Sequence, residues 1–515
     1  MPKIDVSNPS KSLTFGDVLL QSYAIASFLH QNKFHHGTVV AAVLPNISEY
    51  SPICLGVTSI GGVLSPLSAV FTSHEMSAQF NDSKASAVFT IDTILDEVLK
   101  AVKENPSIKT VIVIREGKSI TELPKKFDKV KIVDFEDVLK TYPDPDHNVV
   151  DINDERDLFV LPYSSGTSGT PKGVMLTHKS ISISTTNWTN HIFTDVGLVA
   201  DPPLQPGVTP SFTFTPFYHI LGLSNMITAM DTGATLLTMP KFDFELCCQT
   251  IEKYKIRFLI VVPPLLVQFA KNPIVVKYDL SSLEVILCGA APCGLELANL
   301  VLKRLPNIKF LKQGYGMTET AMIASTSSSK QSTKFESCGR LFPGFEMKIV
   351  DPITKKELDY NETGEIWLKS EQNMIGYLNR PQATAEALDD EGWLHTGDIG
   401  YIDKSTELSY VVDRLKELIK VNGFQVAPGE LESLLLKHPK IKDAAVIGVK
   451  DDAKGEVPKA FVVKEGDLTA EEVQEFIADK VAKYKKLSGG VVFVNQIPKS
   501  PSGKILKRIL KEQIN

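Results

Sequence analysis

The alternation of strand-like and helix-like segments is the feature that most restricts the fold of this chain. Through about the first four hundred residues, short runs rich in β-branched residues alternate with helical patterns. The predicted strands are 39–44, 87–90, 110–114, 257–262, 285–288 and 308–311, and the predicted helices are 47–59, 74–81 and 295–304. Such alternation is typical of an α/β protein with doubly wound parallel sheets that carry helices on both faces. In sheets of this kind, ligands bind beyond the carboxyl ends of the strands.

The pattern changes twice toward the C-terminus, and these changes predict the domain organisation. After about residue 345, short strands and turns predominate, as at 346–350 and 364–368, which predicts a small β-rich subdomain. A compact α+β region follows, with predicted helices 428–437, 470–480 and 504–511 and predicted strands 444–449, 460–463 and 491–494. We therefore expect a large N-terminal domain at 1–412, a connection at 413–416 and a small C-terminal domain at 417–515.

The composition excludes several kinds of partner and site. The chain has 55 Lys and Arg against 61 Asp and Glu, and no block of one sign, which argues against a nucleic-acid surface. The six cysteines lack zinc-site spacing, so reduced, mostly buried thiols are expected. The uncharged stretch 52–71 contains Gly61, Gly62 and Pro66, which predict a buried helix, a turn and a strand rather than a transmembrane span. With no apolar leader and no C-terminal Ser-Lys-Leu signal, we expect a cytoplasmic rather than a peroxisomal protein.

The segment from Tyr163 to Gly173 has the composition of a polyphosphate cradle. It follows a predicted strand at 158–162 and contains three glycines, five Ser or Thr residues and one lysine. Glycines let successive backbone N–H groups converge on an anion. A lysine at about 4 Å attracts a phosphate charge by roughly 4 kcal/mol at an effective dielectric constant of about 20. The predicted phosphate ligands are Ser164, Ser165, Gly166, Thr167, Ser168, Gly169, Thr170 and Lys172. The alternative is a solvated loop, since the spacing of a Walker P-loop is not satisfied.

This segment resembles the phosphate-binding signature of the adenylate-forming superfamily. That superfamily includes acyl-CoA synthetases, hydroxycinnamate–CoA ligases, firefly luciferase and the adenylation domains of peptide synthetases. Four further segments resemble its motifs and follow in its order, at 313–319, 396–398, 413–426 and 498–504. Each alone also fits a simpler structure, namely a Gly-rich turn, a helix cap, a charged turn or a solvated tail. The resemblance implies ATP, Mg²⁺ and coenzyme A as ligands, a small-molecule carboxylic acid as substrate, and a monomer or homodimer.

The resemblance also assigns roles to individual residues. Nucleotide-binding positions match Gln313, Gly314, Tyr315, Gly316, Met317 and Thr318, with Tyr315 stacked on adenine and Glu319 holding Mg²⁺. Asp398 and Arg414 match ribose ligands. The segment 413–416 matches a hinge that pivots at Lys416, so that the small domain is mobile, and Gly423 matches a residue of the CoA tunnel. Catalytic positions match Lys420, Gln425, His219 and Lys504, of which Lys504 joins the carboxylate to the α-phosphate.

The acid substrate is the least constrained part of the prediction. His219 matches a gate between nucleotide and acyl pockets, although a histidine satisfied in the core is the alternative. The predicted pocket walls are Leu221, Gly289, Ala290, Ala291 and Met322. Hydroxycinnamate ligases often have a tyrosine at the position of Leu221, and leucine cannot bond a phenol. The apolar walls favour a medium- or long-chain fatty acid. The alternatives are an aryl, coumarate-like CoA ligase, a luciferase-like oxygenase and a non-catalytic acyl-adenylate binder.

Overall fold

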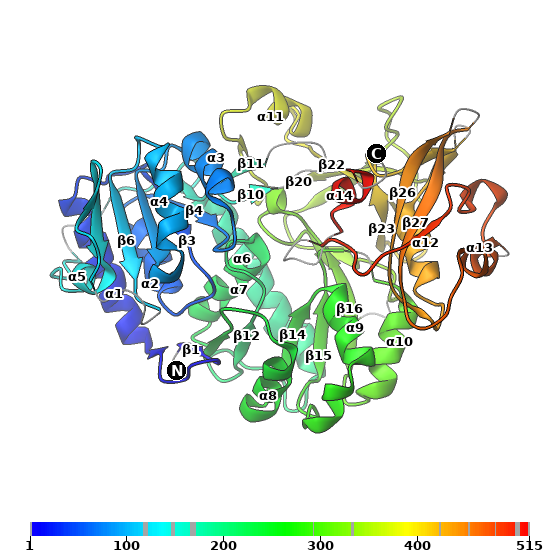
Figure 1. The fold of residues 1–515 in the computed structure, drawn as a ribbon, viewed down its shortest axis with the longest axis horizontal. Helices are drawn as coiled ribbons and strands as arrows, with labels where there is room; N and C mark the ends of the chain where they lie inside the picture. Colours follow the sequence, from blue (N-terminus) through cyan, green and yellow to red (C-terminus); the bar gives the residue numbers. More distant parts are fainter. Residues whose placement is uncertain are drawn as a thin grey trace.

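The structure is a computed structural model that describes residues 3–116, 122–145, 150–164, 171–291, 293–330, 334–421, 424–451, 454–478, 480–499 and 505–512. Five layers make up most of the large N-terminal part, in the order helices, sheet, helices, sheet, helices. A β-rich subdomain and a small C-terminal domain complete the molecule, and the C-terminal domain lies at the end opposite the first sheet (Figure 1). The predicted fold class is confirmed.

The first sheet has a parallel centre and an antiparallel end. Its strands are β3 (Val39–Val43), β4 (Val63–Leu67), β5 (Ala87–Ile91), β6 (Thr110–Ile114), β7 (Lys126–Phe127), β8 (Val130–Asp134), β9 (Leu158–Val160), β10 (Tyr163–Ser164) and β11 (Lys172–Thr177). Their order is β10-β11-β9-β4-β3-β5-β6-β8-β7. The neighbours among β4, β3, β5, β6 and β8 run parallel, whereas β11 runs antiparallel to both β9 and β10. The antiparallel end carries the predicted phosphate segment.

The second sheet is also parallel at its centre. Its strands are β14 (Phe258–Val261), β15 (Val285–Cys288), β16 (Phe310–Tyr315), β17 (Ser325–Thr326) and β18 (Arg340–Leu341), of which the first three run parallel. A third, smaller sheet joins β1 (Lys3–Asp5), β2 (Ser12–Leu13), β12 (Ser211–Thr213) and β13 (Leu236–Thr238). The carboxyl ends of β15 and β16 lead directly into two of the predicted binding segments.

The helices cover both faces of these sheets because each buries one apolar stripe. Between the two large sheets lie α1 (Phe15–Gln31), α2 (Tyr50–Ser59), α6 (His178–Thr194) and α7 (Ile220–Asp231), whose buried side chains share one core with both sheets. The outer faces carry α3 (Ser73–Ser83) and α4 (Leu95–Lys103) on one side and α8 (Phe244–Tyr254), α9 (Pro263–Lys271) and α10 (Leu295–Arg304) on the other. Capping boxes of Thr14 with Asp17 and Thr72 with Glu75 fix the starts of α1 and α3. The short α5 (Phe135–Leu139) follows β8.

The β-rich subdomain is an antiparallel sheet of β19 (Glu346–Val350), β20 (Gly364–Lys369), β22 (Leu394–Ile402) and β23 (Ser409–Arg414). The short β21 (Gly376–Tyr377) lies between β20 and β22 in sequence but pairs with β11 of the first sheet instead. The helix α11 (Pro381–Ala387) follows β21 in sequence. Segments about two hundred residues apart in sequence therefore meet at the phosphate hairpin. This long-range pairing is not visible in the sequence pattern.

The small C-terminal domain is built from one sheet and its covering helices. The sheet contains β24 (Ile419–Val421), β25 (Phe424–Val426), β26 (Ile441–Asp451), β27 (Gly455–Lys464) and β28 (Val491–Phe493), and the helices are α12 (Pro428–Leu435), α13 (Ala470–Ala478) and α14 (Lys507–Glu512). Its contacts with the large part include the Gly429 N–H, which donates to Asp413 Oδ2 over 2.8 Å, and Lys437 Nζ, which lies 2.5 Å from Glu296 Oε1. The boundary predicted at 413–416 stays a prediction.

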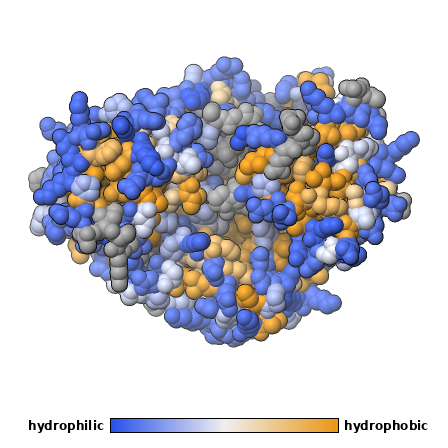
Figure 2. Space-filling view, in the orientation of Figure 1, coloured by the Kyte–Doolittle hydropathy of each residue, from blue (hydrophilic) through white to orange (hydrophobic). Residues whose placement is uncertain are grey.

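The surface and the buried cysteines agree with the composition. Residues 52–71 form most of α2, a turn and β4, as predicted. Among the described residues no helix combines the length and apolar character needed to cross a membrane. On the face in Figure 2, hydrophobic residues gather in separate patches among hydrophilic ones. All six cysteines lie among the described residues, where they are buried and form no disulfide, which agrees with the reduced thiols expected from the sequence.

Candidate active site

The predicted phosphate segment connects two antiparallel strands. Tyr163 pairs with Gly173 and Ser164 with Lys172, so 165–170 join β10 to β11. A Walker loop would instead lead from a strand into a helix. Ser165, Gly166, Thr167, Ser168, Gly169 and Thr170 lie outside the described residues, and their assignment to phosphate stays a prediction. Ser164 and Lys172 flank them and are described.

Glu319 joins the phosphate segment to the nucleotide motif. Its carboxylate is buried, with 6% of the residue exposed, and Oε1 accepts hydrogen bonds from Ser164 Oγ at 3.0 Å and Tyr377 Oη at 2.9 Å. Lys172 Nζ lies 4.7 Å from the centroid of the Tyr377 ring, a cation–π distance. Burial, together with the Glu319 charge, raises the pKa of Tyr377, so its hydroxyl stays protonated and donates. Ser164 and Lys172 of the phosphate segment and Glu319 of the nucleotide motif therefore meet around Tyr377 in one cluster.

This cluster is suited to a hard cation that is bound mostly through phosphate. Mg²⁺ takes oxygen ligands and usually keeps one or two protein carboxylates, with substrate phosphates completing its shell. Glu319 supplies one such carboxylate, and Ser164 supplies a neighbouring hydroxyl. Within the described part of the chain there is no group of three His, Cys, Asp or Glu residues that could hold a metal alone. The donor set fits a cation that arrives with a nucleotide.

The nucleotide motif is built from a strand end that admits no larger side chain. Gln313, Gly314 and Tyr315 end β16, Gly316 and Met317 follow, and Thr318 begins the 3₁₀ turn Thr318–Thr320. A Cβ on Gly316 would lie 2.1 Å from the Met322 carbonyl oxygen, so glycine is required there. Gln313 bridges two loops, since its Oε1 accepts from the Cys293 N–H at 2.9 Å and its Nε2 donates to the Phe335 carbonyl at 2.8 Å. Gln313 thus has a structural role where the sequence suggested a nucleotide contact.

Backbone strain is concentrated in the same region. Ala290, Ala321 and Met322 have φ values of 68°, 51° and 120°, a range that residues other than glycine rarely adopt. Ala290 follows β15, and the other two follow the turn that carries Glu319. Such strain persists only where surrounding contacts enforce it, and it is commonest at binding sites. Two of the three strained residues, Ala290 and Met322, are predicted walls of the acid pocket.

Asp398 and Arg414 lie directly opposite each other on β22 and β23. Asp398 is 5% exposed, its Oδ2 accepts from Tyr315 Oη at 2.7 Å, and its Oδ1 lies 3.4 Å from Arg414 Nε. Burial, with the Asp398 charge, raises the pKa of Tyr315, so this hydroxyl also stays protonated. Thr396, Gly397 and Asp398 lie inside a strand, so the helix-cap alternative for this motif is wrong. The predicted ribose ligands are adjacent and meet the end of β16 at Tyr315.

His219 immediately precedes α7 as a neutral imidazole. Burial lowers its pKa to about 4, and within the described structure its Nε2 is buried without a hydrogen-bond partner. The ring centroid lies 4.3 Å from that of Tyr218. Buried polar atoms without partners are rare and often await a ligand. The unpartnered nitrogen disagrees with the alternative of a histidine satisfied in the core.

Asn46 fixes the loop before His219, and no sequence signal pointed to this role. The Asn46 side chain is buried; its Nδ2 donates to the Thr215 carbonyl at 2.9 Å, and its Oδ1 accepts from the Phe217 N–H at 2.8 Å. Gly222 closes the same turn, because a Cβ there would lie 2.2 Å from the Pro216 carbonyl oxygen. Asn46 lies just before the helix predicted at 47–59, whereas α2 begins only at Tyr50. Because residues 47–49 are not part of the helix, the Asn46 side chain is not packed along a helix and can reach the segment at 215–217.

The predicted walls of the acid pocket lie at three places in the large domain. Leu221 is on α7 and packs against the central core. Gly289, Ala290 and Ala291 follow the carboxyl end of β15, and Met322 follows the turn that carries Glu319. The structure places all five next to strand ends or helix starts of the central layers. Their contact with an acid stays a prediction.

The residues predicted on the small domain are less completely placed. Lys420 is exposed on β24 and lies opposite Gln425 of β25 in the ladder, while Lys416 occupies the exposed turn before β24. Gly423 and Lys504 lie outside the described residues. The helix predicted at 504–511 is α14, Lys507–Glu512. Its first residue, Lys507, pairs with Glu417 at 2.9 Å and Glu432 at 3.3 Å, which anchors α14 beside the start of the domain.

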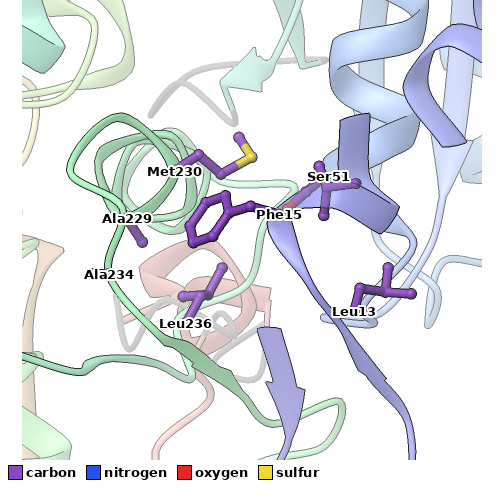
Figure 3. A pocket seen from close by; sticks show the side chains of 8 residues that line it. Leu13, Phe15, Ser51, Ala229, Met230, Ala234 and Leu236 are labelled. Carbon is purple, nitrogen blue, oxygen red and sulfur yellow. The ribbon is translucent and has the colours of Figure 1, made fainter. Parts of the chain in front are cut away.

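Two hollows lie away from this cluster. One is apolar, has about 260 Å³ of space with open solvent included, and lies between α1 and the end of α7, where Phe15 points toward Met230 and Leu236 (Figure 3). The other is a groove between α6, α7, β12 and β14, with about 490 Å³ of space that also includes open solvent. Neither contains a residue of the predicted catalytic set.

The fold and the cluster at Glu319 are suited to an enzyme that binds a nucleotide with its cation, and comparison with known proteins identifies its family. The profile described as AMP-binding enzyme matches residues 2–378, and that described as AMP-binding enzyme C-terminal domain matches residues 430–504. The chain belongs to the AMP-binding enzyme family. It is an AMP-forming acid–CoA ligase.

Curated relatives and solved structures extend this assignment. 4-Coumarate–CoA ligase 3 of Arabidopsis thaliana is 40% identical over 520 residues, covering 100% of this chain and 88% of the relative. 4-Coumarate-CoA ligase 1 of Narcissus pseudonarcissus is 37% identical, covering 98% and 89%. ATP-bound MatB from Rhodopseudomonas palustris shares the fold, with a TM-score of 0.86, 23% identity and coverage of 99% and 95%. Both relatives are named for 4-coumarate, whereas the pocket residues predicted a fatty acid; which acid this chain takes stays a prediction.

Proposed function

We propose that this chain joins an aryl carboxylic acid of the coumarate type to coenzyme A through an acyl-adenylate. The observation that carries the proposal is the cluster in which Ser164 and Tyr377 donate to Glu319 while Lys172 lies over the Tyr377 ring. Glu319 lies a few residues after Tyr315, which bonds Asp398. The cluster at Glu319 suits a triphosphate with its cation, and the Tyr315–Asp398 pair suits a ribose. The 37% and 40% identity to 4-coumarate–CoA ligases supports the choice of acid.

In the first step, a carboxylate oxygen of the acid attacks the α-phosphorus of ATP. A phosphorus–oxygen bond forms, the bond to the β-phosphate bridging oxygen breaks, and pyrophosphate leaves with the electron pair. Two anions approach each other, so charge must be neutralised and in-line geometry fixed. Mg²⁺, when bound, would neutralise charge on the phosphates, and Glu319 would hold it there. Lys172 and Lys504 supply further positive charge, and no protein nucleophile is needed.

Neutral His219 has a distinct task in this scheme. Because its pKa is about 4, the imidazole is uncharged near neutral pH and does not form an ion pair with the acid. Its buried Nε2 can hydrogen-bond a carboxylate oxygen and orient it toward phosphorus. Asn46 holds the preceding loop on both its donor and acceptor sides, which keeps the ring in place.

In the second step, the sulfur of CoA attacks the acyl carbonyl and AMP leaves. The pyrophosphate site and the thiol site need different groups near one carbonyl, so one rigid arrangement does not serve both. The small domain at 417–515 rotates about Lys416 in this scheme, which withdraws Lys504 and brings Lys420, Gly423 and Gln425 toward the acyl-adenylate.

The acid itself is proposed from two opposing observations. The relatives are 4-coumarate–CoA ligases by name, whereas Leu221 offers no hydrogen bond to a ring hydroxyl. We therefore favour an aryl acid recognised by apolar packing, for which removing the ring hydroxyl costs little. A medium-chain fatty acid is the second candidate, because the Leu221 side and the Ala290–Ala291 side of the predicted pocket are apolar.

A pyrophosphate-release assay with and without CoA tests the proposal. The expected result is acid-dependent release, with cinnamate and 4-coumarate turned over within about tenfold of each other, a difference of about 1.4 kcal/mol. Faster turnover of octanoate or decanoate than of both aryl acids would transfer the assignment to fatty acids. No acid-stimulated release with any acid would end the proposal.

A further inference from the structure

Trp188 is held rigidly in the layer between the two large sheets. It is 1% exposed on α6, and its Nε1 donates to Asn225 Oδ1 of α7 at 3.3 Å. The indole stacks on His191 with centroids 6.0 Å apart, and its other neighbours include the rings of Phe258 at 6.4 Å and Phe342 at 6.5 Å. The hydrogen bond and the three neighbouring rings therefore hold the indole of Trp188 in a single orientation.

One side of Trp188 backs onto the predicted wall of the acid pocket. Ser184, one turn before Trp188 on α6, donates from Oγ to the Ala321 carbonyl at 2.6 Å. Phe342, which touches the indole, donates its N–H to the Ala324 carbonyl at 2.9 Å. On α7, Asn225 lies one turn after Leu221, on the same helix face. Two neighbours of the indole, Ser184 and Phe342, therefore bond the segment 321–324, and its partner Asn225 lies one helical turn beyond Leu221.

The other side of Trp188 adjoins the groove of about 490 Å³. Asn225 and Phe258, which contact the indole, also line that groove, together with Ile192, Thr228 and Ile260. Ile192 lies one turn after Trp188 on α6. Asn225 and Phe258 thus lie between the indole and this groove.

We propose that Trp188, held by Asn225, is the floor of the acid site and limits the length of the acid. This inference rests on the proposed function. A compact aryl acid ends at the indole, whereas a long alkyl chain meets it. Shortening this side chain opens the acid site into the groove beside α7, so that acids with longer alkyl tails are accepted.

The test compares chain-length profiles of Trp188→Ala and the milder Trp188→Phe with that of the unchanged protein. Pyrophosphate release is measured with cinnamate, with para-alkyl cinnamates and with straight-chain acids from butanoate to tetradecanoate. We expect kcat/KM of Trp188→Ala to rise by about fourfold for each added CH₂ that enters the groove, the equivalent of about 0.8 kcal/mol. Trp188→Phe should shift the optimum in the same direction by fewer carbons, with KM for ATP unchanged in both variants.

Phe80→Ala is the matched control, because Phe80 is fully buried on α3, in the core on the outer side of the first sheet. It should lower thermal stability without changing the profile. If Trp188→Ala does not fold, the chain-length profile of Trp188→Phe decides the matter. Folded variants that release pyrophosphate with cinnamate but keep the original chain-length profile would show that Trp188 is not the floor of the acid site. The proposed function would remain intact. Absence of release by the unchanged protein with every acid would instead remove the proposed function.

Discussion

Glu319 and Asp398 lie buried in the large domain and already hold their hydrogen-bond partners, whereas Lys420 lies exposed on β24 of the small domain. Glu319 follows the end of β16 and accepts a hydrogen bond from Tyr377, while Asp398 lies on β22 and accepts one from Tyr315. The lysine gains its position from a domain that meets the large part through surface contacts such as Lys437 with Glu296. This contrast suggests a division of work: the large domain holds the nucleotide, and the small domain delivers the groups that change between steps.

The largest expected effect comes from the delivered group. Lys504→Ala should lower acyl-adenylate formation by on the order of 100-fold or more, about 3 kcal/mol or above. Thioester formation from supplied acyl-AMP and CoA should be spared, because the proposed role of Lys504 is confined to the first step. The two half-reactions are measured separately, with Lys511→Ala, at an exposed position of α14, as control. Equal loss in both half-reactions would break the proposed division of work.

A smaller effect is expected at Glu319, the proposed ligand of Mg²⁺. Glu319→Gln keeps the shape and an oxygen acceptor for Ser164 and Tyr377 but removes the charge that attracts Mg²⁺. We expect kcat/KM for ATP to fall by roughly 10- to 100-fold, about 1.4–2.7 kcal/mol, with part of the loss recovered at high Mg²⁺. A magnesium titration measures this, beside Glu391→Gln on the exposed surface. An unchanged magnesium midpoint would argue against Glu319 as the ligand.

Tyr315→Phe should affect ATP binding more than chemistry. Loss of the hydroxyl leaves the buried Asp398 one donor short, a cost of about 1–3 kcal/mol in typical cases, shared with ribose hydroxyls that can take the vacant position. We expect KM for ATP to rise by roughly fivefold to tenfold, about 1.0–1.4 kcal/mol, with kcat nearly unchanged. Tyr410→Phe on β23 is the matched control. A fall in kcat without change in KM would show that Tyr315 acts on the reaction step.

An effect on stability rather than on turnover is expected from two histidines of the large domain. Burial lowers the pKa of both His219 and His191 to about 4, below the unfolded value of about 6.5. The unfolded chain therefore binds more protons between these values, and stability falls as pH falls through this range. At pH 5 each site costs about 2 kcal/mol. His219→Gln and His191→Gln should each reduce the loss of Tm between pH 7 and pH 5, and His74→Gln, at an exposed position of α3, should not.

Regular elements were predictable because their signals are local. The helix predicted at 295–304 is α10, and the strand predicted at 285–288 is β15. β16 was predicted to end at Leu311 but continues to Tyr315, because Gly314 and Lys312 weaken the local strand signal while pairing with β15 and β17 sustains the strand. A local sequence pattern carries no information about which other strands a segment will pair with.

The site was predictable as a set of motifs but not as an arrangement. Glu319, Asp398, Arg414 and Lys172 were identified by resemblance, and the structure places the first and last around one tyrosine. That tyrosine, Tyr377, lies on β21, outside every motif, and reaches the site only because β21 pairs with β11. Asn46 acts across about 170 residues of sequence, so no spacing rule could reveal it.

The Lys437–Glu296 ion pair has a consequence for how the enzyme responds to ionic strength. Both side chains are partly exposed, so dissolved salt screens their attraction, unlike that of the largely buried Lys507 with Glu417 inside the small domain. Raising salt therefore loosens the tie between α10 and the small domain while leaving each unit internally intact. We expect salt to shift the balance between the two orientations proposed for the small domain, so that added electrolyte changes which half-reaction limits turnover.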